Sequence, residues 1–254
     1  MDKLIVFNCI LLLVIFAALM LCKKVCKTQK GKNIALVIAP LVTILFHYSA
    51  FLALYITSGE ATEYLRSNPN LLLPIYPCNV VMWGCLVFGL LRNKASKFAG
   101  FLADYLFWFG IFSTLVGMFA NVDFINNPTL KDFETTKSIV AHATLLFNIL
   151  LLYSFGYVKV DLPRNLLHIA MSVVAMYIIG LYCNKMFEVF MSAEKAYSVN
   201  SMFILHSPFE AVPFLTYPTI AGGALALYFV MFAICELFAY PKGNRWISRL
   251  KKQK

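Results

Sequence analysis

The sequence predicts an all-α fold, a polytopic membrane bundle in which seven transmembrane helices form a single domain over residues 1–254. Three observations lead to this prediction. Of the 254 residues, 61% are hydrophobic and only 13% are charged, with a mean hydropathy of +0.75. The apolar residues are grouped into stretches long enough to cross a bilayer, and the basic residues gather between alternate stretches. A soluble domain of this length needs a charged surface that this composition cannot supply.

A helix needs about 20 apolar residues to cross the hydrocarbon core of a membrane. The seven apolar stretches cover residues 3–22, 34–57, 76–91, 98–120, 137–158, 165–184 and 214–240. The first stretch is expected to be a retained helix and not a signal peptide, because its lysines follow the apolar run and no small-residue cleavage site ends it. The third stretch is short, and its segment can begin earlier, around Leu71.

The distribution of lysine and arginine predicts the orientation. Four segments carry 16 of the 22 basic residues, namely 23–33, 92–97, 159–164 and 241–254. By the positive-inside rule these segments lie in the cytoplasm, so the N-terminus is outside and the C-terminus inside. The basic residues flank helices and form no patch with interleaved aromatic residues, so no nucleic-acid partner is expected. The basic tail at 241–254 is expected to contact anionic lipid.

Two acidic residues lie near the inner ends of predicted helices. Asp104 and Glu236 are expected to pair with Arg92, Lys97 or Lys242, whose long side chains can reach the membrane surface. The seven cysteines show no paired spacing typical of a metal site. We therefore expect no metal and no cofactor.

Cys78 begins the third predicted helix at its outer end, directly after Pro77. Proline suits the first turn of a helix, since its missing N–H would have no partner there. Cys78 then meets unpaired backbone N–H groups and the positive end of the helix dipole, which favour a thiolate and can hold an oxyanion. His142 lies about two turns inside the fifth helix, counted from the same side. The two residues are therefore a candidate nucleophile and acid–base pair.

Less specific explanations exist for each residue. A buried cysteine is often a small hydrophobic side chain, and a membrane histidine can be satisfied by a neighbour, as Thr43 could satisfy His47. Cys85 is interpreted as a packing residue. The residues expected to support the pair or to bind substrate are Asn79, Asn121, Asp123, His47 and Asn200. Of these, Asn121 or Asp123 could orient the His142 ring.

Four stretches carry a family resemblance. LLLPIYPCNVVMW resembles the LPLHLCN-type motif of the YwaF-like bacterial integral membrane family. GIFSTLVGMFANVDFINNP, SIVAHATLLF and VNSMFILHSP are similar to further segments of that family and follow in the same order. The eukaryotic relative of the family is a transmembrane acyltransferase of ether phospholipids. The resemblance implies that Cys78 and His142 are the catalytic pair.

The resemblance and the orientation together suggest a reaction. A site that faces outside has no access to acyl-CoA, so the acyl donor is expected to be a membrane phospholipid. The acceptor would be a lysolipid, a glycolipid or a lipoprotein, and water as acceptor would make the enzyme a lipase. The protein is expected in a bacterial cell membrane. The alternative is a transport-accessory or lipid-binding membrane protein with no enzymatic activity, in which Cys78 and His142 hold helices together.

Overall fold

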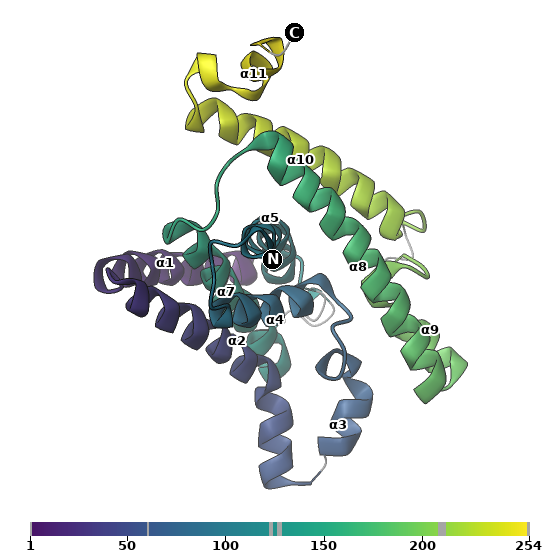
Figure 1. Cartoon of the computed structure of the whole chain (residues 1–254). Coiled ribbons are helices and arrows are strands. Elements are labelled where there is room, and N and C mark those ends of the chain that lie inside the picture. Colours follow the sequence, from purple (N-terminus) through teal and green to yellow (C-terminus); the bar gives the residue numbers. More distant parts are fainter. Residues whose placement is uncertain (1, 60, 122–123, 126–128, 208–211, 253–254) are drawn as a thin grey trace. The chain divides into compact units, whose positions relative to one another are not determined.

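The computed structural model describes the chain except residues 1, 60, 122–123, 126–128, 208–211 and 253–254. The described residues form helices and connecting segments, and none of them is in a strand (Figure 1). The chain divides into two compact units, residues 1–157 and 158–254. Each unit is described by itself.

In the first unit, the elements with described bounds are five long or medium helices and one short one. They are α1 (Asp2–Val25), α2 (Gln29–Thr57), α3 (Ala61–Ser67), α4 (Pro77–Leu90), α5 (Lys97–Phe119) and α7 (Phe133–Ser154). A single 3-10 turn, η1 (Pro69–Leu71), lies between α3 and α4. Helix α4 contacts α2, α5 and α7, and α7 also contacts α1, so α4 packs among helices of its own unit.

The second unit is built on two long helices that pack side by side (Figure 1). These are α8 (Leu162–Phe190) and α10 (Tyr217–Ala239). Between them in sequence, α9 (Ala193–Val199) and the turn η2 (Ser201–Phe203) pack back onto α8. After α10 come the turn η3 (Lys242–Asn244) and the short helix α11 (Trp246–Lys252).

Within the described part of the chain, six helices are long and apolar enough to cross a membrane: α1, α2, α5, α7, α8 and α10. Every apolar stretch found in the sequence contains a helix, but α4 has only 14 residues. At a rise of about 1.5 Å per residue, α4 is about 21 Å long, which is less than the hydrocarbon core of a bilayer. The structure thus confirms an all-helical membrane fold with six candidate spans.

Local chemistry sets the helix boundaries. The side chains of Thr28, Ser96, Asp132 and Ser192 each accept a hydrogen bond from a backbone N–H in the first turn of α2, α5, α7 and α9. Helix α7 consequently begins four residues before the predicted stretch. It also ends four residues earlier than predicted, since Gly156 takes a left-handed conformation (φ +82°) just past its end.

Small residues let the helices of the first unit approach closely. A Cβ atom at Gly89 of α4 would overlap the backbone carbonyl of Leu36 in α2. A Cβ atom at Gly110 of α5 would press on both Ile149 of α7 and Val81 of α4. Such contacts are typical of membrane helices, where close backbone packing replaces hydrophobic exclusion from water.

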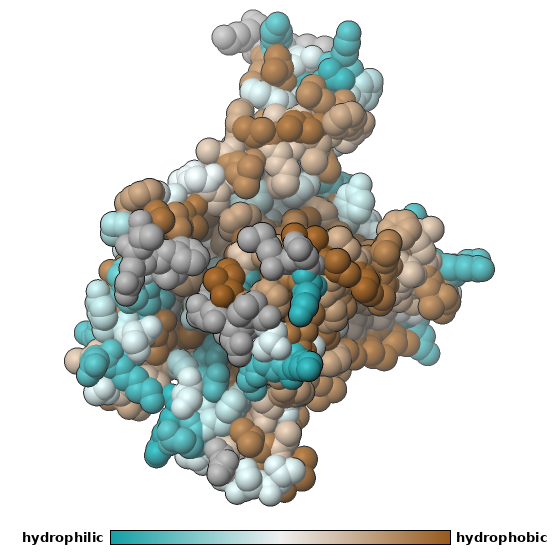
Figure 2. Space-filling model, turned by 180° about the vertical axis from the view of Figure 1, so that it is seen from behind, coloured by the Kyte–Doolittle hydropathy of each residue, from teal (hydrophilic) through white to brown (hydrophobic). Residues whose placement is uncertain are grey.

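The outer surfaces of the helices are apolar. Figure 2 shows hydrophobic residues over broad areas of the visible face. Large apolar side chains on α1, α2 and α10 are among the most exposed, including Leu13 (70%), Ile56 (79%) and Phe238 (87%). An exposed apolar surface of this extent suits contact with lipid chains. The chain is therefore an integral membrane protein.

Candidate functional site

The start of α4 is fixed by its own first turn. Pro77 is the first helical residue, and the side chain of Asn79 accepts a hydrogen bond from the Tyr76 backbone N–H at 3.2 Å. Asn79 is buried and acts as part of the helix cap.

Cys78 is half-buried in the first turn of α4. The backbone N–H groups of Cys78 and Asn79 face its sulfur. The N–H groups of Asn79 and Val80 also reach the carbonyl oxygen of Tyr76, at 3.0 and 3.4 Å. Pro77 has no N–H, and the N–H groups of Asn79 and Val80 already bond to Tyr76. The N–H of Cys78 is therefore the backbone donor of this first turn that can best bind a negative charge, where the sequence suggested several such donors.

His142 is held in a defined tautomer. Its Nδ1 lies 2.8 Å from the carbonyl oxygen of Ser138, one turn earlier in α7. A carbonyl oxygen only accepts, so Nδ1 of the neutral ring carries the hydrogen and Nε2 carries the lone pair. An imidazole with its basic nitrogen away from its own helix is suited to take a proton from a neighbouring group.

The depth of these residues follows from the helix contacts. Val81 of α4 and Ile149 of α7 meet at the same point of α5, next to Gly110. Cys78 lies three residues before Val81, and His142 lies seven residues before Ile149. At about 1.5 Å per residue, His142 is therefore about 6 Å, or roughly one turn, nearer than Cys78 to the side on which α4 and α7 begin.

The same argument places His47 level with Cys78. Helices α2 and α4 run in opposite directions and touch where Gly89 meets Leu36. Eleven residues separate Gly89 from Cys78 along α4, and eleven separate Leu36 from His47 along α2. The three helices contact one another. Cys78, His47 and His142 therefore lie within about one turn of each other in depth, on three neighbouring helices.

His47 lies beside the backbone of Asn70, and its charge state is coupled to those of His142 and Lys137. Its Nε2 is buried and has no hydrogen-bond partner among the described residues. Thr43, the neighbour that sequence analysis offered as a partner, instead accepts a hydrogen bond from Asn148 Nδ2 at 2.8 Å. His47 is therefore not explained by helix packing through Thr43.

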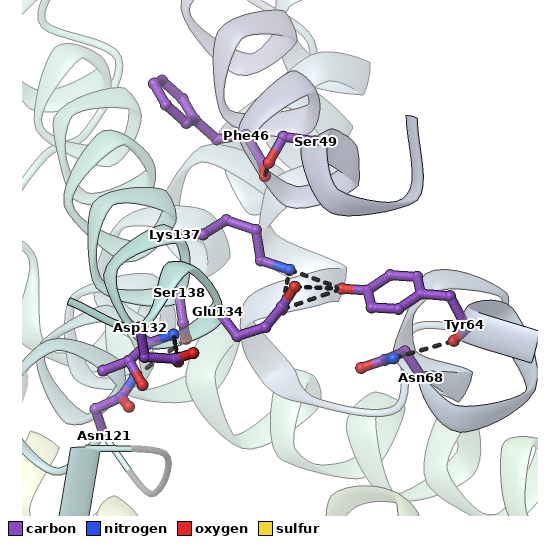
Figure 3. Close-up of polar contacts among 10 residues, drawn as sticks. Phe46, Ser49, Tyr64, Asn68, Asn121, Asp132, Glu134, Lys137 and Ser138 are labelled. Carbon is purple, nitrogen blue, oxygen red and sulfur yellow. Dashed lines mark hydrogen bonds and ion pairs between the residues drawn. The ribbon is translucent and has the colours of Figure 1, made fainter. Parts of the chain in front are cut away.

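Asn121 bonds to two residues that contact His142, and no described contact joins it to the His142 ring itself. Its Nδ2 donates to the hydroxyl of Ser138 at 3.0 Å and to the carbonyl of Gly117 at 3.2 Å (Figure 3 shows the contact to Ser138). Ser138 supplies the carbonyl that orients His142, and Gly117 lies against the ring. Asn121 thus acts on the ring through these two residues. Asp123, the other candidate for this role, lies outside the described residues.

A second polar group, at the start of α7, was not foreseen as part of the site. Lys137 of α7 donates to the hydroxyl of Tyr64 in α3 at 3.0 Å and pairs with Glu134, while the Tyr64 hydroxyl contacts both oxygens of Glu134 (Figure 3). Burial raises the pKa of Tyr64, so its hydroxyl stays protonated at neutral pH. The spacing of Glu134 and Lys137, three apart at a helix start, was the available sequence signal.

Asn200 lies in the second unit, at the left-handed turn after α9 (φ 44°). Its Oδ1 accepts from the N–H of Leu205 at 2.9 Å, and its Nδ2 donates to the carbonyl of His206 at 2.7 Å. The backbone of the next residue, Ser201, is held by the side chain of Asn184 at 2.7 and 3.3 Å. The contacts of Asn200 therefore shape this turn.

Glu236 has a partner other than those expected. Its carboxylate, 1% exposed, accepts from Arg249 Nη2 at 2.9 Å and not from Arg92, Lys97 or Lys242. The expectation was wrong because the chain after α10 folds back, which brings α11 to the end of its own unit. Asp104 is fully buried in α5. Among the described residues no group of three or more His, Cys, Asp or Glu side chains is placed to hold a metal ion.

The chain matches a known family of membrane proteins. The profile described as the TMEM164 family, a transmembrane family, matches residues 2–239. This match is consistent with the expected relation to the eukaryotic transmembrane acyltransferase. The relation to YwaF-like bacterial proteins stays a prediction. No curated protein and no solved structure matches the chain significantly.

Proposed function

The chain belongs to the TMEM164 family, and from this premise we propose that it is a membrane acyltransferase. It moves a fatty acyl chain from a phospholipid to a second lipid or to a lipoprotein through a thioester on Cys78. One observation carries the proposal. A cysteine at a helix start lies within about one turn, in depth, of a histidine whose Nδ1 bonds to the Ser138 carbonyl, so the neutral ring carries its lone pair on Nε2.

In the first half of the reaction the Cys78 thiol gives its proton to Nε2 of His142, and the sulfur attacks the ester carbonyl of the phospholipid. The backbone N–H of Cys78 is the donor nearest to the developing oxyanion. When the tetrahedral intermediate collapses, the C–O bond breaks and the leaving alkoxide takes the proton from His142. The products are a lysophospholipid and an acyl thioester on Cys78.

In the second half a hydroxyl or amine of the acceptor gives its proton to His142 and attacks the thioester. The C–S bond breaks, and the sulfur recovers the proton. A lysolipid, a glycolipid or a lipoprotein serves as acceptor, and water in that place would give a lipase. His47 lies at the depth of Cys78, so we assign it a supporting role in this site.

We also propose seven spans, with the N-terminus outside and the C-terminus in the cytoplasm of a bacterial cell membrane. The 16 basic residues of the four alternate segments support this orientation. Helix α4 is short, but the segment just before it is covered by other parts of the protein, since Leu71 and Ile75 are only 6% and 2% exposed. Irregular backbone is tolerated at membrane depth where protein covers it. The site then faces outside, where a phospholipid is the available acyl donor.

The test is mass spectrometry of the purified full-length protein after incubation with a phospholipid labelled in its acyl chains. We expect an acyl adduct on Cys78 and transfer of label to a lysolipid. Cys78→Ser should lose the adduct and nearly all transfer. Cys85→Ser is the matched control, because Cys85 is on the same helix, is 3% exposed and has no proposed role. Full transfer by a folded Cys78→Ser variant would return the protein to the non-enzymatic alternative.

A further inference from the structure

The segment that follows α10 is folded back onto the end of that helix in the second unit. The buried carboxylate of Glu236 accepts from the backbone N–H of Trp246 at 2.8 Å and from Arg249 at 2.9 Å. Arg249 also reaches Asp161 at 3.3 Å, and the Leu162 N–H lies 3.4 Å from Glu236. These contacts hold the C-terminal segment against the beginning of α8 and the end of α10.

A cavity of about 290 Å³ lies inside this fold-back. Its lining residues combine apolar and basic side chains: Ala233, Glu236, Leu237, Lys242, Arg245, Trp246, Ile247 and Ser248. The volume is sufficient for a phosphate group with part of the glycerol attached to it. The cavity is therefore large enough for a lipid headgroup and too small for a folded partner.

The charges around the cavity favour an anion. Glu236, the acid in its lining, pairs with Arg249, which Asp161 shares, so these two acids and the three bases Arg249, Lys242 and Arg245 leave a net charge of +1. Lys242 has no acidic partner among the described residues. Arg245 donates Nε to the carbonyl of Tyr240 at 3.2 Å and Nη2 to that of Leu237 at 3.0 Å, and both acceptors are uncharged. Two positive charges thus face the cavity without an acid of their own, and the guanidinium keeps further N–H donors.

The surroundings indicate a lipid rather than a soluble anion. Helix α10 is a candidate span that ends at Ala239, so the cavity lies at a membrane surface. Ile247 and Leu250 of α11 are each 51% exposed, and Leu237 and Phe238 of α10 are 52% and 87% exposed. Apolar side chains that flank a basic group at the end of a spanning helix match the two ends of a phospholipid.

We propose that this cavity binds the headgroup phosphate of an anionic phospholipid. Lys242 and Arg245 bind the phosphate, and the acyl chains run along the exposed side of α10. The Glu236–Arg249 pair keeps the cavity formed. This site lies in the second unit and does not depend on any chemistry at Cys78.

The experiment uses the full-length protein in detergent micelles and the fluorescence of Trp246, taken as the difference between the wild type and Trp246→Phe. Dibrominated phosphatidylglycerol and dibrominated phosphatidylcholine are titrated as quenchers. We expect phosphatidylglycerol to quench Trp246 at a lower mole fraction than phosphatidylcholine. Each lost charge should weaken this preference about fivefold, which corresponds to about 1 kcal/mol.

The variants are Lys242→Gln alone and together with Arg245→Gln. Lys242→Gln removes a side chain that makes no described contact, so it keeps the fold even if Arg245→Gln loosens the end of α10. Lys23→Gln with Lys24→Gln, an exposed basic pair at the end of α1, is the control and should keep the preference.

Several outcomes would overturn the proposal. Equal quenching by the two lipids, or an unchanged preference in the folded double variant, would show that no anionic headgroup is bound here. Displacement of phosphatidylglycerol by inorganic phosphate alone would identify a free-phosphate site instead. Displacement by an acidic peptide, with no effect of phosphate, would point to a protein partner.

Discussion

The imidazole ring of His142 lies directly against the backbone of Gly117, where a Cβ atom would overlap the ring. The two residues come from α7 and α5, which pack along much of their length. Together with the carbonyl of Ser138, Gly117 thus determines where the ring can be. The position of the proposed acid and base depends on the absence of a side chain on the facing helix.

Replacing Gly117 with alanine should therefore reduce acyl transfer strongly while leaving the helices intact. The added methyl group forces the His142 ring out of its place, and a displacement of about 1 Å can cost on the order of 100-fold in rate. The measurement is label transfer from phospholipid by the purified variant. Gly223→Ala is the control, since a Cβ atom there meets nothing within 4 Å. A fully active Gly117→Ala variant would contradict the assigned position of the ring.

His142→Ala should lose transfer by about 100-fold or more, because neither the leaving alkoxide nor the acceptor would have a proton partner. The losses of His142→Ala and Cys78→Ser should not multiply in the double variant, since the two residues act in the same steps. Rates of label transfer for the two single variants and the double variant provide the test. Multiplied losses would mean that the residues act independently.

His47→Ala should reduce transfer less than His142→Ala does. His47 lies at the depth of Cys78 with a buried, unpartnered Nε2 and beside the backbone of Asn70, and the proposed reaction passes its proton through His142 alone. The transfer rates of the two purified variants distinguish the roles. His142→Ala should lose about 100-fold or more, whereas His47→Ala should keep a larger part of the wild-type rate. The opposite ranking would assign the acid and base role to His47.

Asp132→Asn should make the stability of the first unit less dependent on pH. The backbone N–H of Thr135 donates to Asp132 at 2.8 Å, which lowers the pKa of this carboxyl. Stabilisation by the charge is therefore present above the unfolded-state pKa of about 4 and is lost as the pH falls through the lower folded-state value. Asparagine keeps a capping oxygen without the charge. The difference in melting temperature between wild type and variant should shrink on acidification, and a constant difference would contradict this account.

Arg249→Gln should destabilise the second unit by about 2 kcal/mol or more, because it leaves the buried Glu236 carboxylate without its cation. Glu236→Gln with Arg249→Gln should cost less than the two single changes added together. Lys185→Gln, which breaks an exposed pair with Glu188, is the control and should change little. The measurement is the melting temperature of each purified variant. An unchanged melting temperature for Arg249→Gln would mean that other contacts hold the C-terminal segment in place.

The sequence by itself determined the helices and the class of protein. Apolar stretches of spanning length, and the side chains of Ser96 and Asp132 at helix starts, are local features, so they could be located without knowing the packing. The position of Cys78 at the first turn of a helix was likewise predictable, since Pro77 precedes it. Whether a segment forms a helix depends mainly on residues within about one turn of each other, and those residues are close in the sequence.

Only the tertiary structure decided which residues of different helices share a level. Close contacts such as that of Gly89 with the Leu36 carbonyl set the register of one helix against the next. This register cannot be predicted from a local sequence pattern. That register brings His47 to the depth of Cys78 and sets His142 about one turn away. In the same way the fold-back after α10 gave Glu236 the partner Arg249, thirteen residues along the chain. The pattern of side chains along a helix determines which face turns inward, whereas close backbone packing determines the position of each helix along the axis of its neighbour.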